Sequence, residues 1–341
     1  MGYKEYLVRR ALQIIPVLVG LSILIFTISR VLPGDPVRLA LGPEATQEQV
    51  IQLKQEMGLD QPIWAQYIDW IQGVFNGQWG ASLRTGNNVL YDITLRLPAT
   101  FELVTVALTF AVIMAIPFGV IAGTNKDQWQ DHISRILALT GVSMPRFWVG
   151  ILLQILFVVF MGLLPLTGRL SDNVAPPPTV THLYLVDSLI AGQWNTFVDA
   201  AKHIVLPAFA LGLSTLAQVM RLVRSDMIDE QRKDYVLAAQ AYGLPKNLIK
   251  YKYMLKNAFT SSLTIIGLAF GFLMGNAFLV EIVFAWPGMA AYGVNAILYQ
   301  DFNAIVGVVL VVGLAFVTAN FIVDLLYGYL DPRVRLREGS G

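Results

Sequence analysis

The chain has 341 residues, of which 55% are apolar and only 14% are charged. A soluble domain carries about 25% charged residues, so this composition excludes a disordered chain, a collagen-like repeat and an ordinary cytosolic enzyme. The 24 Lys and Arg residues nearly balance the 23 Asp and Glu residues, which leaves no basic surplus for a nucleic-acid partner. The chain has no cysteine, which excludes a disulfide framework and cysteine-ligated metal. These features indicate a polytopic membrane protein in a lipid bilayer.

A helix needs about 20 mainly apolar residues to cross the hydrocarbon core of a bilayer. Six runs meet this requirement: 12–31, 99–122, 136–164, 204–222, 263–285 and 304–330. The third run contains Pro145, so its first turns either lie at an interface or are kinked by that proline. We therefore expect an all-α fold in which residues 1–341 form a single transmembrane domain with six helices.

Two segments outside the spans are long enough to have structure of their own. Residues 32–98 are too polar to cross the membrane, and their amphipathic helical pattern and several tryptophans indicate a lid-like segment at the outer surface. A separate soluble domain is the alternative for this segment. Residues 99–330 are expected to form a five-helix core that includes an inner loop over residues 225–260.

The distribution of basic residues predicts the orientation, because loops on the cytoplasmic side carry an excess of Lys and Arg. The first span, residues 9–31, starts at two arginines and is too long for a signal-peptide core, so we expect it to remain uncleaved. With the N-terminus inside, 16 of the 24 Lys and Arg residues lie in inner segments and one, Arg146, lies within a span. The other seven lie in outer segments: Arg30, Arg38, Lys54, Arg84, Arg96, Arg169 and Lys202. This asymmetry places both termini on the cytoplasmic side.

The inner loop has the pattern of two short helices. Residues 229–242 are good helix formers, Gly243 suits a helix C-terminus, and a second short helix is expected over residues 245–255. We expect Ala238 and Ala239 to present one small-residue face, so that the pair of helices forms a knob that fits a groove of another protein. A solvated basic loop remains the alternative.

At this loop the chain resembles the permease subunits of bacterial and archaeal ATP-binding-cassette (ABC) importers. Their inner loop carries the EAA motif, E-A-A-x-x-x-G, followed by a hydrophobic run. The matching residues here are Ala238, Ala239 and Gly243, with Leu255-Lys256-Asn257-Ala258 at the close. Leu237 stands where the motif has Glu, but the peptide-importer subfamily often lacks this Glu and begins with an Asp-Tyr pair, here Asp234-Tyr235.

Further motifs of that subfamily occur in order along nearly the whole chain. They are Leu32-Pro33-Gly34-Asp35-Pro36, Gly58-Leu59-Asp60-Gln61-Pro62, Pro98-Ala99-Thr100-Phe101-Glu102-Leu103, Gly141-Val142-Ser143-Met144-Pro145, Phe284-Ala285-Trp286-Pro287-Gly288 and Asp331-Pro332-Arg333. The pattern is similar to the first permease of dipeptide and oligopeptide importers. Nickel and some oligosaccharide importers use permeases of the same group, so these substrates remain alternatives.

The resemblance implies a MetI-like, type I importer fold and a set of partners in a bacterial or archaeal inner membrane. The partners are a second, homologous permease subunit, two ABC ATPase subunits that bind ATP and Mg²⁺, and an extracytoplasmic binding protein. The ATPase-coupling loop would contain Asp234, Tyr235, Ala238, Ala239, Gly243 and Leu244. The permease itself would bind no cofactor.

The residues themselves offer little for catalysis. No Gly-Lys pair occurs, so the chain has no P-loop and any ATP must be hydrolysed by another subunit. The three histidines, His132, His182 and His203, have no partner at helical spacing, so we expect no metal site and no enzyme. An ion-coupled secondary transporter is a further alternative, but the paired intramembrane acids and inverted repeat common in that class are missing.

Polar residues inside apolar segments are candidates for a translocation path or gate, because they are costly in a membrane. The candidates are Arg146, Gln154, Gln218, Asn276 and Glu281. For Arg146, a structural role at the Pro145 kink and a role in the path are both open. Glu281 is expected near the outer mouth. Glu102 and Asp324 are expected to have structural roles.

Overall fold

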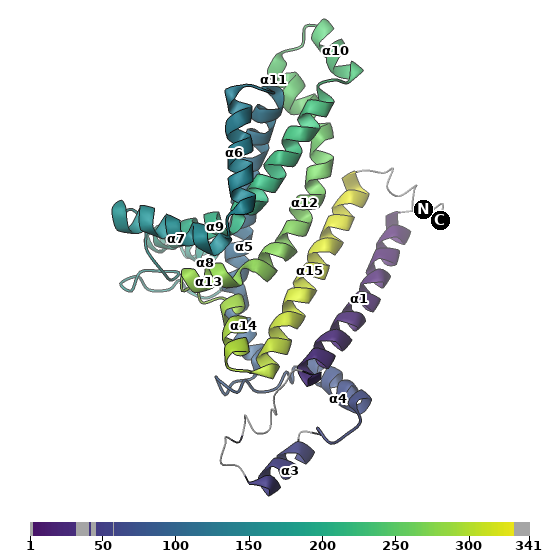
Figure 1. Cartoon of the computed structure of the whole chain (residues 1–341), viewed down its shortest axis with the longest axis vertical. Helices are drawn as coiled ribbons and strands as arrows, with labels where there is room; N and C mark the ends of the chain where they lie inside the picture. Colours follow the sequence, from purple (N-terminus) through teal and green to yellow (C-terminus); the bar gives the residue numbers. More distant parts are fainter. Residues whose placement is uncertain (1–2, 32–40, 42–45, 57, 331–341) are drawn as a thin grey trace.

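The structure is a computed structural model that describes residues 3–31, 41, 46–56 and 58–330, and Figure 1 shows it as a bundle of helices. The described residues contain no strand, only an isolated bridge between Ala81 and Asn88. The predicted all-α class is therefore confirmed. The motifs at residues 32–36 and 331–333 lie outside the described residues, as do the chain ends.

Four helices are long and apolar enough to span a membrane alone. They are α1 (Tyr3–Val31), α5 (Val89–Thr124), α9 (Trp194–Glu230) and α15 (Phe302–Leu330). Two bent helix pairs raise the total to six among the described residues if each pair is counted as one span. Helix α5 begins ten residues before the expected span, because Asn88 caps it by accepting a hydrogen bond from the Leu90 N–H. Residues 89–98, the last of the expected outer segment, therefore form the beginning of α5.

The third expected span is not one straight helix. It consists of α6 (Trp129–Ser143) and a segment formed by α7 (Arg146–Leu153) and the π-helical η1 (Gln154–Phe160), and the two parts meet at 110°. Pro145 lacks an N–H and disfavours helical geometry at Met144, which is extended at φ −83° and ψ 131°. The proline therefore turns the chain out of the bundle, as α7 does in Figure 1.

The fifth expected span, residues 263–285, is also not one straight helix. The helix after the inner loop starts as α11 (Lys246–Leu248) and continues through η2 (Ile249–Met254) into α12 (Leu255–Asn276), with a 59° bend between residues 246–259 and 262–276. The second short helix expected in the inner loop therefore does not end at residue 255 but continues into α12. It stops at Asn276, and residues 278–283 form a separate short helix, α13 (Phe278–Val283).

Helices α5 and α9 pack closely along their lengths and form the centre of the bundle. A Cβ added at Gly212 of α9 would lie 2.6 Å from the carbonyl oxygen of Ala107 of α5, and one at Gly123 of α5 would lie 2.8 Å from that of Arg224. Small residues let helix backbones approach in this way, as membrane helix pairs often do. The close packing makes this pair a rigid support for the bent segments.

The two ends of the bundle carry different elements (Figure 1). At one end lie α14 (Met289–Leu298), α3 (Gln47–Glu56) and α4 (Ile63–Phe75), and at the other lies α10 (Asp234–Ala241). Helix α4 packs on α1, where the hydroxyls of Tyr67 and Ser22 are 2.8 Å apart and the Tyr67 ring meets the Phe26 ring edge-on at 5.4 Å. Part of the expected lid segment is therefore held against the first span.

Candidate functional site

The inner loop folds into a short helix, α10, that lies beyond the ends of α9 and α12 (Figure 1). It ends in a Schellman motif: the N–H of Gly243 donates to the carbonyl of Gln240, and the N–H of Leu244 donates to that of Ala239. This motif needs a left-handed residue, and Gly243 has φ +72° as the sequence predicted. The start differs from the expected residue 229, since residues 229 and 230 belong to α9 and α10 begins at Asp234.

The exposed face of α10 is largely apolar. Leu237 is 58% exposed and Tyr242 is 86% exposed, and Ala238 lies open between them. Ala239, in contrast, is only 9% exposed and packs in a cluster with Val236. The expectation that Ala238 and Ala239 share one face is therefore wrong: adjacent residues on a helix are about 100° apart, and the fold buries only the second. The exposed residues are Asp234, Leu237, Ala238, Gln240, Ala241 and Tyr242, and the large apolar side chains among them are Leu237 and Tyr242.

A buried carboxylate fixes α10 to the bundle. The hydroxyl of Tyr235 and the ammonium group of Lys233 each donate a 2.5 Å hydrogen bond to Glu230, the last residue of α9. Burial and the acceptor Glu230 together raise the pKa of Tyr235. The motif residue Tyr235 is thus held by an acid that lies outside the motif, and Asp234 is the exposed first residue of α10.

Three of the five candidate path residues line one cavity. Arg146, Gln218 and Asn276 surround a volume of about 400 Å³ together with Ser214, Phe147 and Phe278. The cavity lies where α7 leaves α6, beside α9 and the junction of α12 with α13. Arg146 donates from Nε to the hydroxyl of Ser214 at 3.0 Å. The bend at Pro145 and the break between α12 and α13 therefore bring together polar residues that are far apart in the sequence.

Gln154 and Glu281 lie elsewhere. The amide of Gln154 donates to the carbonyl oxygens of Leu166 at 3.0 Å and Val283 at 3.1 Å, which holds η1 to α13. Glu281 is 0% exposed and accepts hydrogen bonds from the Thr100 hydroxyl at 2.6 Å and from the Ala291 N–H at 2.7 Å. The expectation that Glu281 lines an outer mouth does not fit this placement, since its carboxylate joins α5 to α14.

Glu102 has the structural role expected for it. Its carboxylate pairs with Arg169 at 2.7 Å and accepts the N–H of Leu185 at 2.7 Å. The Arg169 guanidinium also lies 3.6 Å from the centre of the Tyr184 ring. This cluster ties α5 to the loop before α8 (Tyr184–Ile190). The side chain of Asp324 lies outside the described residues.

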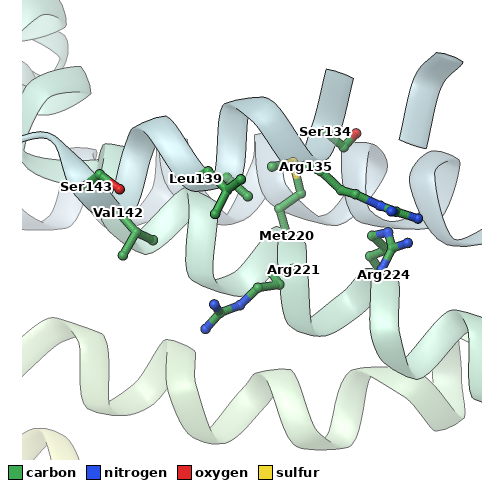
Figure 2. A pocket seen from close by; sticks show the side chains of 9 residues that line it. Ser134, Arg135, Leu139, Val142, Ser143, Met220, Arg221 and Arg224 are labelled. Carbon is green, nitrogen blue, oxygen red and sulfur yellow. The ribbon is translucent and has the colours of Figure 1, made fainter. Parts of the chain in front are cut away.

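A second cavity, of about 280 Å³, lies between α6 and α9 and is mostly apolar (Figure 2). At one end, the buried carboxylate of Asp131 pairs with Arg135 at 2.6 Å and with Arg224, which clamps α6 to α9. Figure 2 shows Arg135 and Arg224 near each other and Arg221 pointing away from them. No local sequence pattern predicts this clamp, because Asp131 and Arg224 are 93 residues apart.

Apolar helices that pack around a close-packed pair and are long enough to cross a membrane define a multi-pass membrane protein. Comparison with known families gives the same class. Residues 115–336 match the family described as "Binding-protein-dependent transport system inner membrane component", and residues 3–104 match its N-terminal counterpart. The chain belongs to this family and is an inner-membrane permease component.

Individual relatives match over nearly their whole length. The chain is 41% identical to the probable D,D-dipeptide transport system permease protein DdpB of Escherichia coli (strain K12), over 98% of both chains. It is 39% identical to the dipeptide transport system permease protein DppB of Alkalihalophilus pseudofirmus, over 97% of this chain and 99% of the relative. The glutathione transport system permease protein GsiC of Escherichia coli (strain K12) is 32% identical, over 98% and 99%.

Proposed function

We propose that this chain forms half of the translocation path of an ATP-driven importer for short peptides. The observation that carries the proposal is its full-length similarity to permeases named for dipeptide and glutathione transport. A second, different permease subunit completes the path, an extracytoplasmic binding protein delivers the peptide, and two ATPase subunits bind ATP and Mg²⁺. Nickel chelates and oligosaccharides are the alternative substrates.

We further propose that α10 is the element on which an ATPase subunit docks. Its exposed Leu237, Ala238 and Tyr242 form an apolar surface of the kind that binds a protein groove. The bonds of Tyr235 and Lys233 to Glu230 support this role, because they join α10 rigidly to α9. A movement of the ATPase would therefore be passed to a helix that runs through the bundle centre.

The orientation that follows puts α10 and both chain ends in the cytoplasm. Single cysteines at Asp229, next to α10, and at Gln78, near the opposite end, test it in this cysteine-free chain. We expect an impermeant thiol reagent to label Gln78→Cys in intact cells and Asp229→Cys only after permeabilisation. The reverse pattern would contradict the proposed orientation.

Reconstitution tests the function itself. The complex with its binding protein, second permease and ATPases in proteoliposomes should take up labelled dialanine when ATP is present and not when a non-hydrolysable analogue replaces it. The purified chain alone should not hydrolyse ATP. Uptake of a nickel chelate or an oligosaccharide in place of dialanine would contradict the peptide assignment, and uptake without ATP would favour a secondary transporter.

A further inference from the structure

The charge on Arg146 has no counter-charge among the residues that the structure describes. Its Nε donates to Ser214, but Nη1 is buried without a hydrogen-bond partner, and no described carboxylate pairs with the guanidinium. Arg146 is partly buried, and a cation without an anion inside a membrane-spanning region is costly and marks a functional site by default. Arg146 therefore has a free charge and a free donor at the 400 Å³ cavity.

The other polar groups around this cavity also suit an anionic ligand. No acidic residue is among the described residues that line it. The side-chain amide of Gln218 makes no hydrogen bond to the described part of the chain, and Asn276 uses only its NH₂ group, which donates to the carbonyl of Phe272 at 2.7 Å. The first turn of the eight-residue α7 opens here, with no side chain capping its N–H groups. The positive end of a helix adds to the attraction of a cationic side chain for an anion.

The size and the apolar lining of this cavity restrict its ligand to a small molecule that carries both an anionic group and apolar groups. Pockets for small molecules have volumes of about 300–1,000 Å³, and this cavity of about 400 Å³ is at the lower end. Met144, Phe147, Phe278 and Leu279 complete the lining and offer apolar contacts to small side chains. A short peptide is a zwitterion whose N-terminal end carries an ammonium group. Its C-terminal end matches this lining, because it carries a carboxylate whatever the side chains are.

We propose that Arg146, with Gln218, holds the C-terminal carboxylate of the peptide as it passes through the permease. This inference rests on the proposed function. A site within a path must bind well enough to admit its cargo and weakly enough to release it. A single charge-assisted contact is strong enough to hold the carboxylate. Release is possible because a movement of α7 or of the α12–α13 junction would carry a wall of the cavity away from the carboxylate.

The first test compares dialanine with dialanine amide, which lacks the carboxylate charge. Uptake by the complete reconstituted complex is measured at concentrations that saturate the binding protein with each peptide. Arg146→Gln should reduce dialanine uptake about tenfold or more, as expected for loss of a charge-assisted hydrogen bond, and should affect the amide less. Arg146→Lys should keep most of the preference for dialanine. Arg221→Gln, the same change at the neighbouring apolar cavity in Figure 2, is the matched control and should leave both rates unchanged.

A second readout does not depend on delivery by the binding protein. A cysteine at Gln218 in this cysteine-free chain reports occupancy of the cavity through its rate of reaction with a small thiol reagent. Millimolar dialanine should slow this reaction in the assembled complex, and dialanine amide should not. In the background of Arg146→Gln, dialanine should lose this effect. A cysteine at the exposed Gln78, which lies outside the cavity and outside the proposed docking surface, serves as the control and should react at the same rate with either peptide.

The outcomes separate the possible partners of Arg146. Equal losses of dialanine and amide uptake in Arg146→Gln, or loss of the second permease subunit from the purified complex, would show that the arginine pairs with a carboxylate of that subunit and would overturn the inference. Equal protection of Gln218→Cys by both peptides would also overturn it. If the native complex imports neither peptide, the proposed function fails first and the inference fails with it.

Discussion

The hydroxyl of Tyr235 on α10 donates a 2.5 Å hydrogen bond to the buried carboxylate of Glu230, the last residue of α9. Only five residues separate the two, but the helix is interrupted between them, so this bond sets the direction in which α10 leaves the bundle. A buried carboxylate must keep its donors, because an unsatisfied charge is expensive away from water. The position of the proposed docking surface therefore depends on this pair.

Replacing Tyr235 with Phe removes the donor and leaves the rest of the ring in place. We expect a loss of about 1–2 kcal/mol in the stability of the inner region and weaker stimulation of the ATPase by the loaded binding protein. Thermal unfolding and ATPase assays of the purified complex measure the two effects. Tyr251→Phe is the matched control, since Tyr251 is 50% exposed and its hydroxyl makes no hydrogen bond to the described residues. Equal effects of the two changes would show that the bond to Glu230 does not matter.

Gly288→Ala tests the buried junction around Glu281. A Cβ at residue 288 would overlap the Glu281 carboxylate, which would have to give up its bonds to Thr100 and Ala291. We expect a loss of at least about 3 kcal/mol in stability, from overpacking and unsatisfied polar groups combined. Gly275→Ala, where the nearest atom outside the glycine's own helix is 3.8 Å away, should cost little or be stabilising. Similar unfolding temperatures for both variants would contradict this account of the junction.

The stability of the loop before α8 should depend on pH through Asp187, which lies in α8. Burial of this carboxylate raises its pKa, but hydrogen bonds from the Thr181 side chain and from the backbone N–H groups of Val180, Thr181 and His182 outweigh the burial and lower the pKa below its ordinary value of 3.8. A lowered folded-state pKa means that the carboxylate stabilises the fold above the unfolded-state pKa and loses this effect as pH falls through the folded value. Asp187 therefore stabilises the folded protein at neutral pH and loses this contribution in acid.

We therefore expect native protein to be more stable than Asp187→Asn by a constant amount above about pH 5, with the difference shrinking below about pH 4. Unfolding temperatures of both proteins between pH 3 and pH 7 measure it. Taking the difference between the two removes the effects of all other titrating groups. A difference that stays constant down to pH 3, or grows, would show that the hydrogen bonds of Asp187 do not favour its charged form.

Hydropathy and helix-capping residues predicted much of this architecture, because they act over short stretches of sequence. The apolar runs located the spans, and Gly243 located the end of α10. The 110° bend at Pro145 was only one of two alternatives, since a proline can either kink a membrane helix or end it. The direction of this bend depends on the residues that α7 packs against, and no local sequence pattern identifies those residues.

The polar contacts of the candidate site were harder to predict. Thr100 and Glu281 meet across 181 residues, and a single sequence carries no signal for such a pair. The exposed face of α10 could not be predicted either. Ala238 and Ala239 are equivalent in the motif, and only the packing of α10 on the bundle decides that Ala239 is buried. Arg146, Gln218 and Asn276 could be named as polar residues in apolar segments, but their meeting at one cavity depends on two bends.

The most direct test of the docking role of α10 compares two glycine substitutions in the reconstituted complex. Gly243 and Gly192 both have positive φ, +72° and +66°, and at neither position would an added Cβ come within 4 Å of another group. Valine at either position is therefore strained by the backbone alone, but Gly243 ends α10 and Gly192 lies at the opposite end of α9.

The measurement is ATPase activity with and without the peptide-loaded binding protein, together with the subunit stoichiometry of each purified complex. The account predicts that Gly243→Val loses stimulation by the binding protein, through misdirected or lost ATPase subunits, and that Gly192→Val keeps it. Normal stimulation and peptide uptake by Gly243→Val at normal expression would contradict the account and leave the inner segment as a solvated basic loop.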